Sequence, residues 1–207
     1  LLVFFTSDRG LAGAFNSNLI KAAQQFIREH EGAEIEMELI GRKGRDFFRK
    51  RGAKISGEHI GLTNEALYDD VAPIARQAID RYRKGEIDAV YLLFNEFKSV
   101  LSQKLAAERV LPIELPSAET RPFEFIYEQA PEELLGLLLP RFVEVAMHHA
   151  LLESAAAEHA ARMTAMDAAT SNAAELIDKL TLHMNRVRQA SITNEIIEVV
   201  SGSSALA

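Results

Sequence analysis

Residues 141–200 read RFVEVAMHHALLESAAAEHAARMTAMDAATSNAAELIDKLTLHMNRVRQASITNEIIEVV, sixty positions without glycine or proline and with thirteen alanines. Alanine has the highest helix propensity, whereas glycine and proline interrupt helices. We therefore predict one helix of about 90 Å, at a rise of ~1.5 Å per residue. Because an average helix has only about 11–12 residues, this one is either a stalk or a helix that needs partners.

A regular apolar stripe runs along this helix in alternating steps of four and three residues. Its positions are Leu138, Phe142, Val145, His149, Leu152, Ala156, His159, Met163, Met166, Thr170, Ala173, Ile177, Leu180, Met184 and Val187. A 3.5-residue repeat of this length predicts a left-handed coiled coil with a second helix. We assign its seam to Met163, Met166, Ala173, Ile177, Leu180, Met184 and Val187. The rest of the chain is not helical enough to cover this rod, so we expect the rod to have no partner within the chain.

The residues before the rod alternate between strand and helix patterns. Strands are predicted at residues 1–6, 35–40, 53–60, 87–97, 104–113 and 123–128, and helices at 16–30, 43–50 and from 63 or 64 to 84. This alternation predicts an α/β fold: an open, mostly parallel, Rossmann-like sheet with helices on both faces and one antiparallel edge. We assign residues 1–130 to this globular domain and residues 131–207 to the long helix, half of an antiparallel coiled-coil shaft. Pro131 suits a first helical turn, and Pro140 should break or kink the helix.

Composition excludes several classes of function. The net charge of −7 gives no broad basic surface for nucleic acid, and the lack of cysteine excludes disulfides and thiolate metal sites. No apolar run approaches the ~20 residues of a membrane span. The sequence begins on an apolar strand without methionine, so we expect that it belongs to a longer protein.

Motifs for catalysis or cofactor binding are weak. The GLAG of residues 10–13 lacks the G-x-G-x-x-G spacing, and the GRKG of residues 41–44 lacks the P-loop pattern. Glycines there suit tight turns instead. The pairs Glu144/His148 and His149/Glu153 do not have the Glu-x-x-His spacing of di-iron bundles, so we interpret these histidines as solvated or seam-lining. We predict no catalytic residue, no cofactor and no metal.

The end of the rod is polar on most sides. Arg188 and Gln189 offer hydrogen-bond donors to loops of a surrounding protein, and a solvated helix end is the alternative.

Several motifs together resemble one family. ARMTAMDAA at residues 161–169, Asn172, NRVRQASITNE at 185–195 and the Ser-Gly at 201–202 resemble the C-terminus of gamma subunits of F-type, rotary ATP synthases, and SDRGLAGAFN at 7–16 resembles the first strand, turn and helix of their globular domain. The resemblance covers the whole chain. It implies a non-catalytic central-stalk rotor that transmits torque between the membrane c-ring and the catalytic alpha and beta subunits.

The resemblance also implies contact residues, partners and a location. Arg188, Gln189, Thr193 and Glu195 are the positions implied to touch the catalytic subunits. The epsilon subunit is a further implied partner, and the place is the cytoplasmic face of the bacterial inner membrane, with the chain peripheral to it.

This sequence departs from the family pattern in three ways. It lacks the long N-terminal helix that pairs with the C-terminal one, it has Ala12 where cysteine is frequent, and it lacks the cysteine-bearing insertion of chloroplast members. A bacterial-type subunit is therefore expected, with its partner helix preceding Leu1. Without that helix, we expect this fragment to self-associate through the stripe or to leave the rod frayed.

Two other functions fit parts of the pattern. One is a free-standing α/β protein that binds a nucleotide or another ligand and dimerises through its long helix. The other is an adaptor with a coiled-coil tail.

Overall fold

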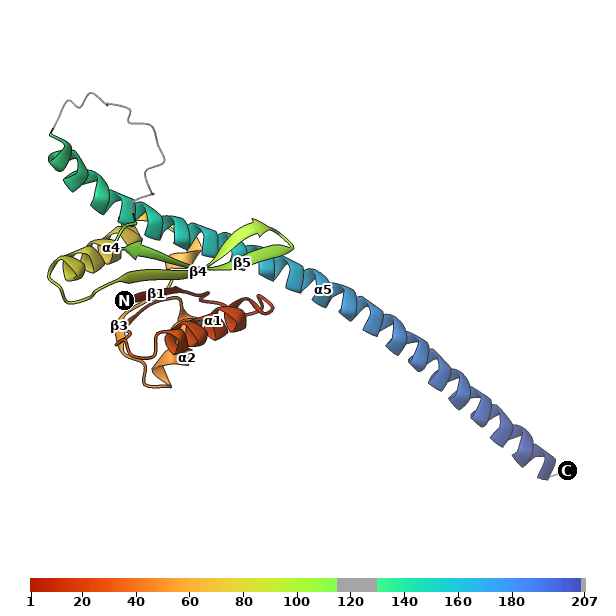
Figure 1. Ribbon diagram of the computed structural model, residues 1–207. Coiled ribbons are helices and arrows are strands. Elements are labelled where there is room, and N and C mark those ends of the chain that lie inside the picture. Colours follow the sequence, from red (N-terminus) through yellow and green to blue (C-terminus); the bar gives the residue numbers. More distant parts are fainter. Residues whose placement is uncertain (115–129, 206–207) are drawn as a thin grey trace. The chain divides into compact units, whose positions relative to one another are not determined.

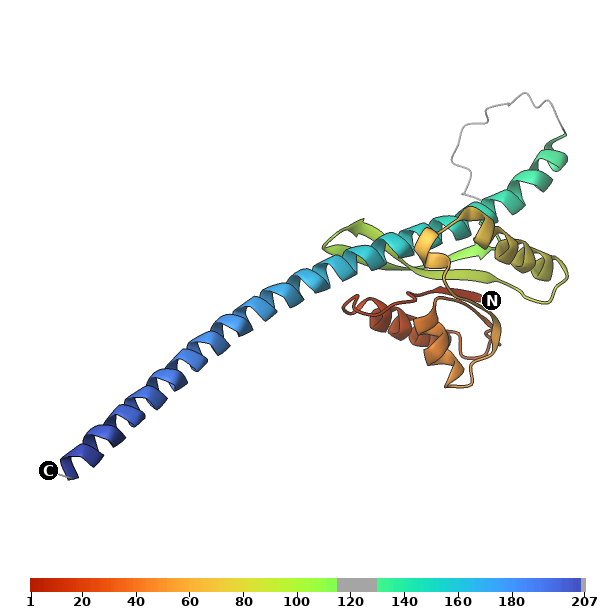
Figure 2. The same cartoon turned by 180° about the vertical axis from the view of Figure 1, so that it is seen from behind.

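The computed structural model describes residues 1–114 and 130–205, and its core is a five-stranded sheet (Figures 1 and 2). The strands are β1 Leu2–Phe5, β2 Met37–Ile40, β3 Ile55–His59, β4 Val90–Ser99 and β5 Ser102–Leu111. Their order in the sheet is β3-β2-β1-β4-β5. The pairs among β1 to β4 are parallel, and β5 pairs antiparallel with β4. The predicted fold class is confirmed: an open, mostly parallel sheet with one antiparallel edge, followed by a long helix.

Helices cover both faces of this sheet. They are α1 Phe15–Glu29, α2 Arg42–Arg49, α3 Leu62–Glu65, α4 Tyr68–Arg83 and α5 Pro131–Ala205. Alternate residues of β1 point to opposite faces, as the two-residue period of a strand requires. Val3 and Phe5 join a core with α4 and the first part of α5, whereas Leu2 and Phe4 join a second core with α1 and α2. Strand β1 is buried on both sides, which explains its uninterrupted apolar sequence.

Two predicted elements differ in detail from the structure. The helix expected from residue 63 or 64 to residue 84 is divided into α3 and α4, because Ala66 takes a left-handed conformation with φ 49° and Leu67 is extended. Helix α5 continues through Pro140, so a break there is wrong, whereas a kink stays a prediction. The strand predicted at residues 123–128 lies outside the described residues.

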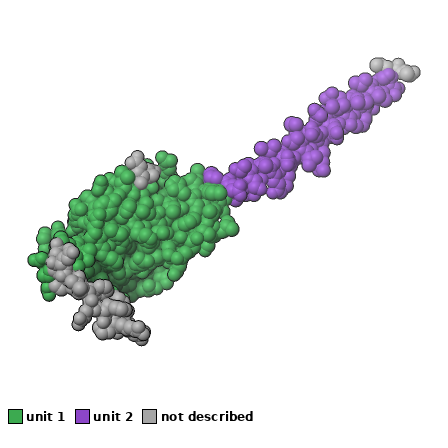
Figure 3. All heavy atoms as spheres, turned by 90° about the horizontal axis from the view of Figure 1, so that it is seen from above, with its two compact units in different colours: residues 1–164 green, residues 165–207 purple. Residues whose placement is uncertain are grey.

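The chain divides into two compact units, residues 1–164 and residues 165–207 (Figure 3). The predicted boundary at residue 130 coincides with the start of α5, but the first part of that helix belongs to the first unit. Val143, Met147, Ala150 and Leu151 are buried in the core that α4 and the sheet share. The expectation that the chain supplies no partner for the rod is therefore wrong for this part of α5.

Helix α5 is also the one helix of the described chain that is long and apolar enough to cross a membrane by length and composition alone. The sequence expectation of no such segment missed it because the apolar residues are not consecutive. Part of this apolar character is accounted for by packing on the sheet in the first unit, since 28% of the most apolar stretch is buried.

Candidate interaction surface

Helix α5 has two opposite faces within the first unit. Val143, Met147, Ala150 and Leu151 are fully or almost fully buried against the sheet and α4. The apolar members of the predicted stripe lie on the other side and are exposed, namely Leu138, Phe142, Val145, Leu152, Ala156 and Met163. The stripe is therefore a solvent-facing apolar surface on a helix whose opposite face packs against the sheet and α4.

Glu144 holds the rotational position of α5. Its carboxylate is almost completely buried and accepts a hydrogen bond from Arg76 Nε of α4 at 2.7 Å and from Arg141 Nη1 at 3.2 Å. The Tyr68 hydroxyl donates to the same carboxylate. Burial alone would raise the pKa of Glu144, but the hydrogen bonds from Arg76 and Tyr68 outweigh burial and lower it. The ionised carboxylate thus fastens α5 to α4 through Tyr68 and Arg76.

Further polar contacts fix α5 along the sheet. His148 Nε2 donates to the carbonyl of Ala66 at 2.9 Å, and Glu153 accepts a hydrogen bond from the backbone N–H of Phe97 at 2.7 Å. The left-handed conformation of Ala66 therefore places its carbonyl where α5 can bind it. Because a rotation of α5 would break these contacts, the outward direction of the stripe is fixed.

The same helix is tied to the loop after β1. Glu158 is buried and pairs with Arg162 at 2.5 Å, and Arg162 Nη2 donates to the carbonyl of Gly10 at 3.4 Å. Ala157 packs in the same core as Ala12. In open α/β sheets, ligands bind beyond the carboxyl ends of the strands where the strand order reverses, here between β1 and β4. The side chains of α5 reach the β1 side of this region.

The glycines near that edge have a packing role. A Cβ on Gly41 would lie 2.0 Å from the Thr6 carbonyl oxygen, and one on Gly44 would lie 2.8 Å from Thr6 Oγ1. Asp8 accepts hydrogen bonds from the backbone N–H groups of Arg42 at 3.0 Å and Gly61 at 2.8 Å. The donors that could have met a phosphate are thus directed at a carboxylate of the chain itself, which weighs against the nucleotide-binding alternative.

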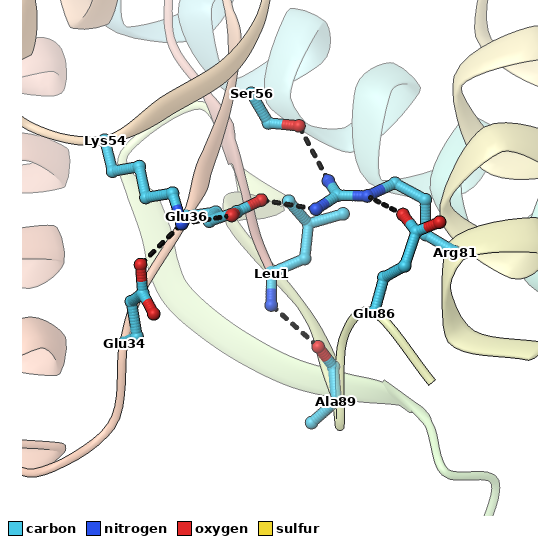
Figure 4. Close-up of polar contacts among 8 residues, drawn as sticks. All are labelled: Leu1, Glu34, Glu36, Lys54, Ser56, Arg81, Glu86 and Ala89. Atoms are coloured by element: carbon cyan, nitrogen blue, oxygen red, sulfur yellow. Dashed lines mark hydrogen bonds and ion pairs between the residues drawn. The ribbon is translucent and has the colours of Figure 1, made fainter. Parts of the chain in front are cut away.

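A second polar network lies at the opposite edge of the sheet (Figure 4). Arg81 of α4 contacts Glu36 at 2.5 Å, Ser56 at 2.7 Å and Glu86 at 3.3 Å, and Lys54 contacts Glu36 at 2.7 Å. Hydrogen bonds from Lys54 and Arg81 lower the pKa of Glu36. These contacts fasten α4 to the β2 and β3 side of the sheet, and they provide no nucleophile paired with a base.

His148 and His149 of α5 bind different protein groups. Glu144 and His148 do not share a ligand, because each has its own partner, and His149 lies 3.5 Å from Glu153. Among the described residues, no group of three or more potential ligands could hold a metal ion.

The second unit carries the remaining predicted contact residues. Apart from Met163, which lies in the first unit, the seam residues Met166, Ala173, Ile177, Leu180, Met184 and Val187 are all exposed there. Arg188, Gln189, Thr193 and Glu195 are exposed as well, with the Thr193 hydroxyl donating to the Gln189 carbonyl at 2.8 Å and Ser191 lying 3.4 Å from Glu195. Their proposed contacts stay predictions.

The sequence interpretation missed the residues that bind α5 to the sheet. Val143, Met147, Ala150 and Leu151 recur at helical spacing and form a second apolar stripe beside the first one. That pattern could have been found, because an apolar arc wider than a coiled-coil seam indicates two packing surfaces. The partners of Glu144 could not, because they are distant in the sequence.

Comparison with known proteins identifies a family for this arrangement. A family model described as ATP synthase matches residues 1–206. The ATP synthase gamma chain of Solibacter usitatus is 65% identical over 204 residues, which cover 99% of this chain and 71% of that protein. The gamma chain of Pelotomaculum thermopropionicum is 48% identical over 206 residues, with 99% and 72% covered.

Solved structures agree with this fold. The central stalk and c-ring structure of the Tetrahymena thermophila mitochondrial ATP synthase contains a chain of 25% identity and TM-score 0.64, covering 82% of this chain and 75% of that one. A chain of the Euglena gracilis mitochondrial ATP synthase has a TM-score of 0.73 over 99% of this chain and 72% of its own length, at 19% identity, and shows the fold alone.

The fold and the two-faced helix, together with these similarities, define a subunit of the membrane-bound ATP synthase complex. Within that class, the chain belongs to the gamma-chain family of F-type ATP synthases.

Proposed function

We propose that this chain acts as the central-stalk rotor of the ATP synthase, in which α5 is one helix of a two-helix shaft. The observation that carries this function is the exposed apolar stripe on a helix whose opposite face is locked to a sheet. Exposed apolar surface of this length is costly in water and indicates a partner. A second helix with the same 3.5-residue repeat fits the stripe.

Torque requires that the shaft cannot turn independently of the globular fold. The buried Glu144 contacts and the Arg162–Gly10 contact hold α5 at well separated points of the first unit. Neither the helix nor the sheet can rotate about the α5 axis without breaking buried polar contacts, which is costly. Support for a rotor therefore comes from the anchoring as well as from the stripe.

We further assign partners and roles on this basis. The alpha and beta subunits surround the shaft, with Arg188, Gln189, Thr193 and Glu195 touching their loops, and the epsilon subunit and the c-ring bind the globular end. We also propose that the chain itself makes and breaks no bonds, because its role as a shaft is to transmit torque to the catalytic subunits. Its location is the cytoplasmic face of the bacterial membrane.

Labelled rotation in the assembled complex tests this proposal. The chain has no cysteine, so Leu101→Cys at the exposed turn between β4 and β5 gives it a single labelling site. With the alpha and beta subunits immobilised, a probe on this residue should rotate in one direction when ATP is hydrolysed. A stationary probe during sustained ATP hydrolysis would show that the chain is not the rotor.

A further inference from the structure

The strongest local concentration of positive charge lies on α2 and on the two residues that follow it. Residues 42–51 read RKGRDFFRKR, with six of the 23 basic residues and one of the 30 acidic ones. The chain as a whole has a net charge of −7. Arg42, Lys43, Arg49, Lys50 and Arg51 are exposed. Such concentration of one sign in an acidic protein indicates a surface that meets an acidic partner.

Most of these cations have no carboxylate of their own. Arg45 pairs with the adjacent Asp46 at 2.7 Å, and Arg49 lies 3.9 Å from Glu58. Within the described parts of the chain, no carboxylate lies at ion-pair distance from Arg42, Lys43, Lys50 or Arg51. Their positive charge is therefore available to another molecule.

A groove between α1 and α2 adjoins this basic surface. It has a volume of about 390 Å³ and is lined by Gln24, Ile27, Arg28, Phe48, Arg51 and Ala53. Its floor is apolar, with the nearly buried Phe48 beside the half-buried Ile27 and Ala53. Figure 1 shows α1 and α2 side by side on the same face of the sheet, away from α5, and Figure 2 shows the same from behind.

Two guanidinium groups at the rim of the groove are held in place. Arg51 stacks on the Phe47 ring, with 3.6 Å from its guanidinium carbon to the ring centre, and donates to the Phe47 carbonyl. Arg28 Nε donates to the Gln24 carbonyl at 3.3 Å. Each keeps further N–H groups for an incoming carboxylate, and a guanidinium that is already held loses less entropy on binding.

We propose that this groove docks an acidic segment of another polypeptide, with an apolar side chain on Phe48 and flanking carboxylates on Arg28 and Arg51. This surface is on the face of the sheet opposite to α5, so the proposal is independent of the rotor function. A recessed apolar floor between two charged rims matches a peptide whose apolar and acidic side chains alternate in space.

An anionic bilayer fits the surface less well than a peptide. Residues 42–51 carry a net charge of +5, from six basic residues and one acidic residue, so the rest of the chain carries −12, because −7 minus +5 is −12. A peptide covers only the basic surface, whereas a bilayer extends beyond it and meets the acidic remainder. Phe48 is also recessed in the groove, with 3% of its surface exposed, so a flat interface meets it less well than a peptide side chain does.

Binding of a synthetic peptide to the whole chain tests the proposal. The probe is fluorescein-labelled EELEELEE, measured by fluorescence anisotropy, with QQLQQLQQ and EESEESEE as matched peptides. Arg28→Glu with Arg51→Glu should weaken binding of the probe by about tenfold or more. Lys84→Glu with Lys104→Glu makes the same charge change at exposed sites outside the groove and should weaken it by less than about twofold.

The other arms separate the contributions of charge and apolar contact. Both matched peptides should bind more weakly than the probe, because each lacks one of the two contacts. Circular dichroism should show that the variants keep their fold; for a variant that does not, Arg28→Gln with Arg51→Gln replaces it, with a smaller loss expected. Equal loss in the two charge-reversal variants, or equal binding of all three peptides, overturns the proposal. Binding of phosphatidylglycerol vesicles that needs Arg28 and Arg51, without binding of the probe, also overturns it.

Discussion

At the scale of single residues, Thr6 is the point where β1 meets α2. Its hydroxyl donates to the Ile40 carbonyl at 3.1 Å and accepts from the N–H of Gly44 at 2.9 Å. Gly41 adopts φ 97°, a conformation that side chains rarely take, and stands against the Thr6 carbonyl. Gly41 and Gly44 are therefore required by the close approach of α2 to β1.

Gly41→Ala should destabilise the fold by more than about 3 kcal/mol, because the added Cβ meets a backbone oxygen and the backbone is strained as well. Gly136→Ala is the matched control. It lies inside α5 with no atom within 4 Å of the added Cβ, so it should stabilise the chain by about 0.5–1 kcal/mol. Chemical unfolding followed by circular dichroism measures both. A loss below about 1 kcal/mol for Gly41→Ala would contradict the packing role.

Glu144 gives the first unit a dependence on pH. Its folded pKa is lowered, so its contribution to stability is complete above the unfolded pKa of about 4.3 and is lost as the pH falls through the folded value. Glu144→Gln should cost about 2 kcal/mol at pH 7. Between pH 6 and pH 3 the unmodified chain should lose more stability than this variant. Parallel pH profiles for the two proteins would show that the fold does not lower the pKa of Glu144.

At the scale of elements, α5 shows what hydrophobic periodicity can and cannot determine. Every position of the 3.5-residue repeat from Leu138 to Met163 is exposed in the first unit, and its packing on a second helix stays a prediction. The repeat did not reveal the second face, because Val143, Met147 and Leu151 lie outside its positions. Periodicity shows that a face is apolar, but the tertiary contacts of Glu144 and His148 decide which stripe is buried.

The stripe should make the isolated chain self-associate. Ile177→Asp with Leu180→Asp removes two stripe residues, and Leu176→Asp with Leu182→Asp removes two equally exposed leucines outside it. Each stripe side chain buried on association contributes about 1.5 kcal/mol to its free energy, so Ile177→Asp with Leu180→Asp should weaken association by about 100-fold. Leu176→Asp with Leu182→Asp should change it little. Light scattering and sedimentation measure this. A monomer of 23.0 kDa before any substitution would contradict the prediction.

At the scale of the whole molecule, the two units are stabilised by different interactions. The first unit has two hydrophobic cores and buried polar contacts, and the second is the remainder of α5 with its side chains exposed. A single helix with so few tertiary contacts depends on partners for stability, since most helical stability in proteins comes from packing. Substitutions at its tip should therefore affect partners and leave the fold of this chain unchanged.

Arg188→Ala with Gln189→Ala should impair coupled turnover in the assembled complex and leave the melting temperature of the isolated chain unchanged, because both side chains are exposed. Asn185→Ala with Arg186→Ala is the matched control, with the same kinds of side chain nearby on the helix. It should have a smaller effect on proton-driven ATP synthesis. A large fall in melting temperature for the first variant would indicate a structural role instead.

Much of this protein could be predicted from the sequence because the signals are local. Alternation of strand and helix patterns determined the α/β class, and the long stretch without glycine or proline determined α5. The C-terminal motifs determined the family. Those signals depend on backbone preference and on side-chain spacing within one element.

The tertiary structure alone decided how the elements use these residues. It brought Arg76 and Tyr68 to Glu144, divided the helix at Ala66, and set Arg28 and Arg51 at the rim of one groove. Each of these arrangements depends on contacts between residues of different elements. These arrangements depend on the free energy of burying and pairing side chains that are distant in the sequence. A pattern within one element therefore does not predict them.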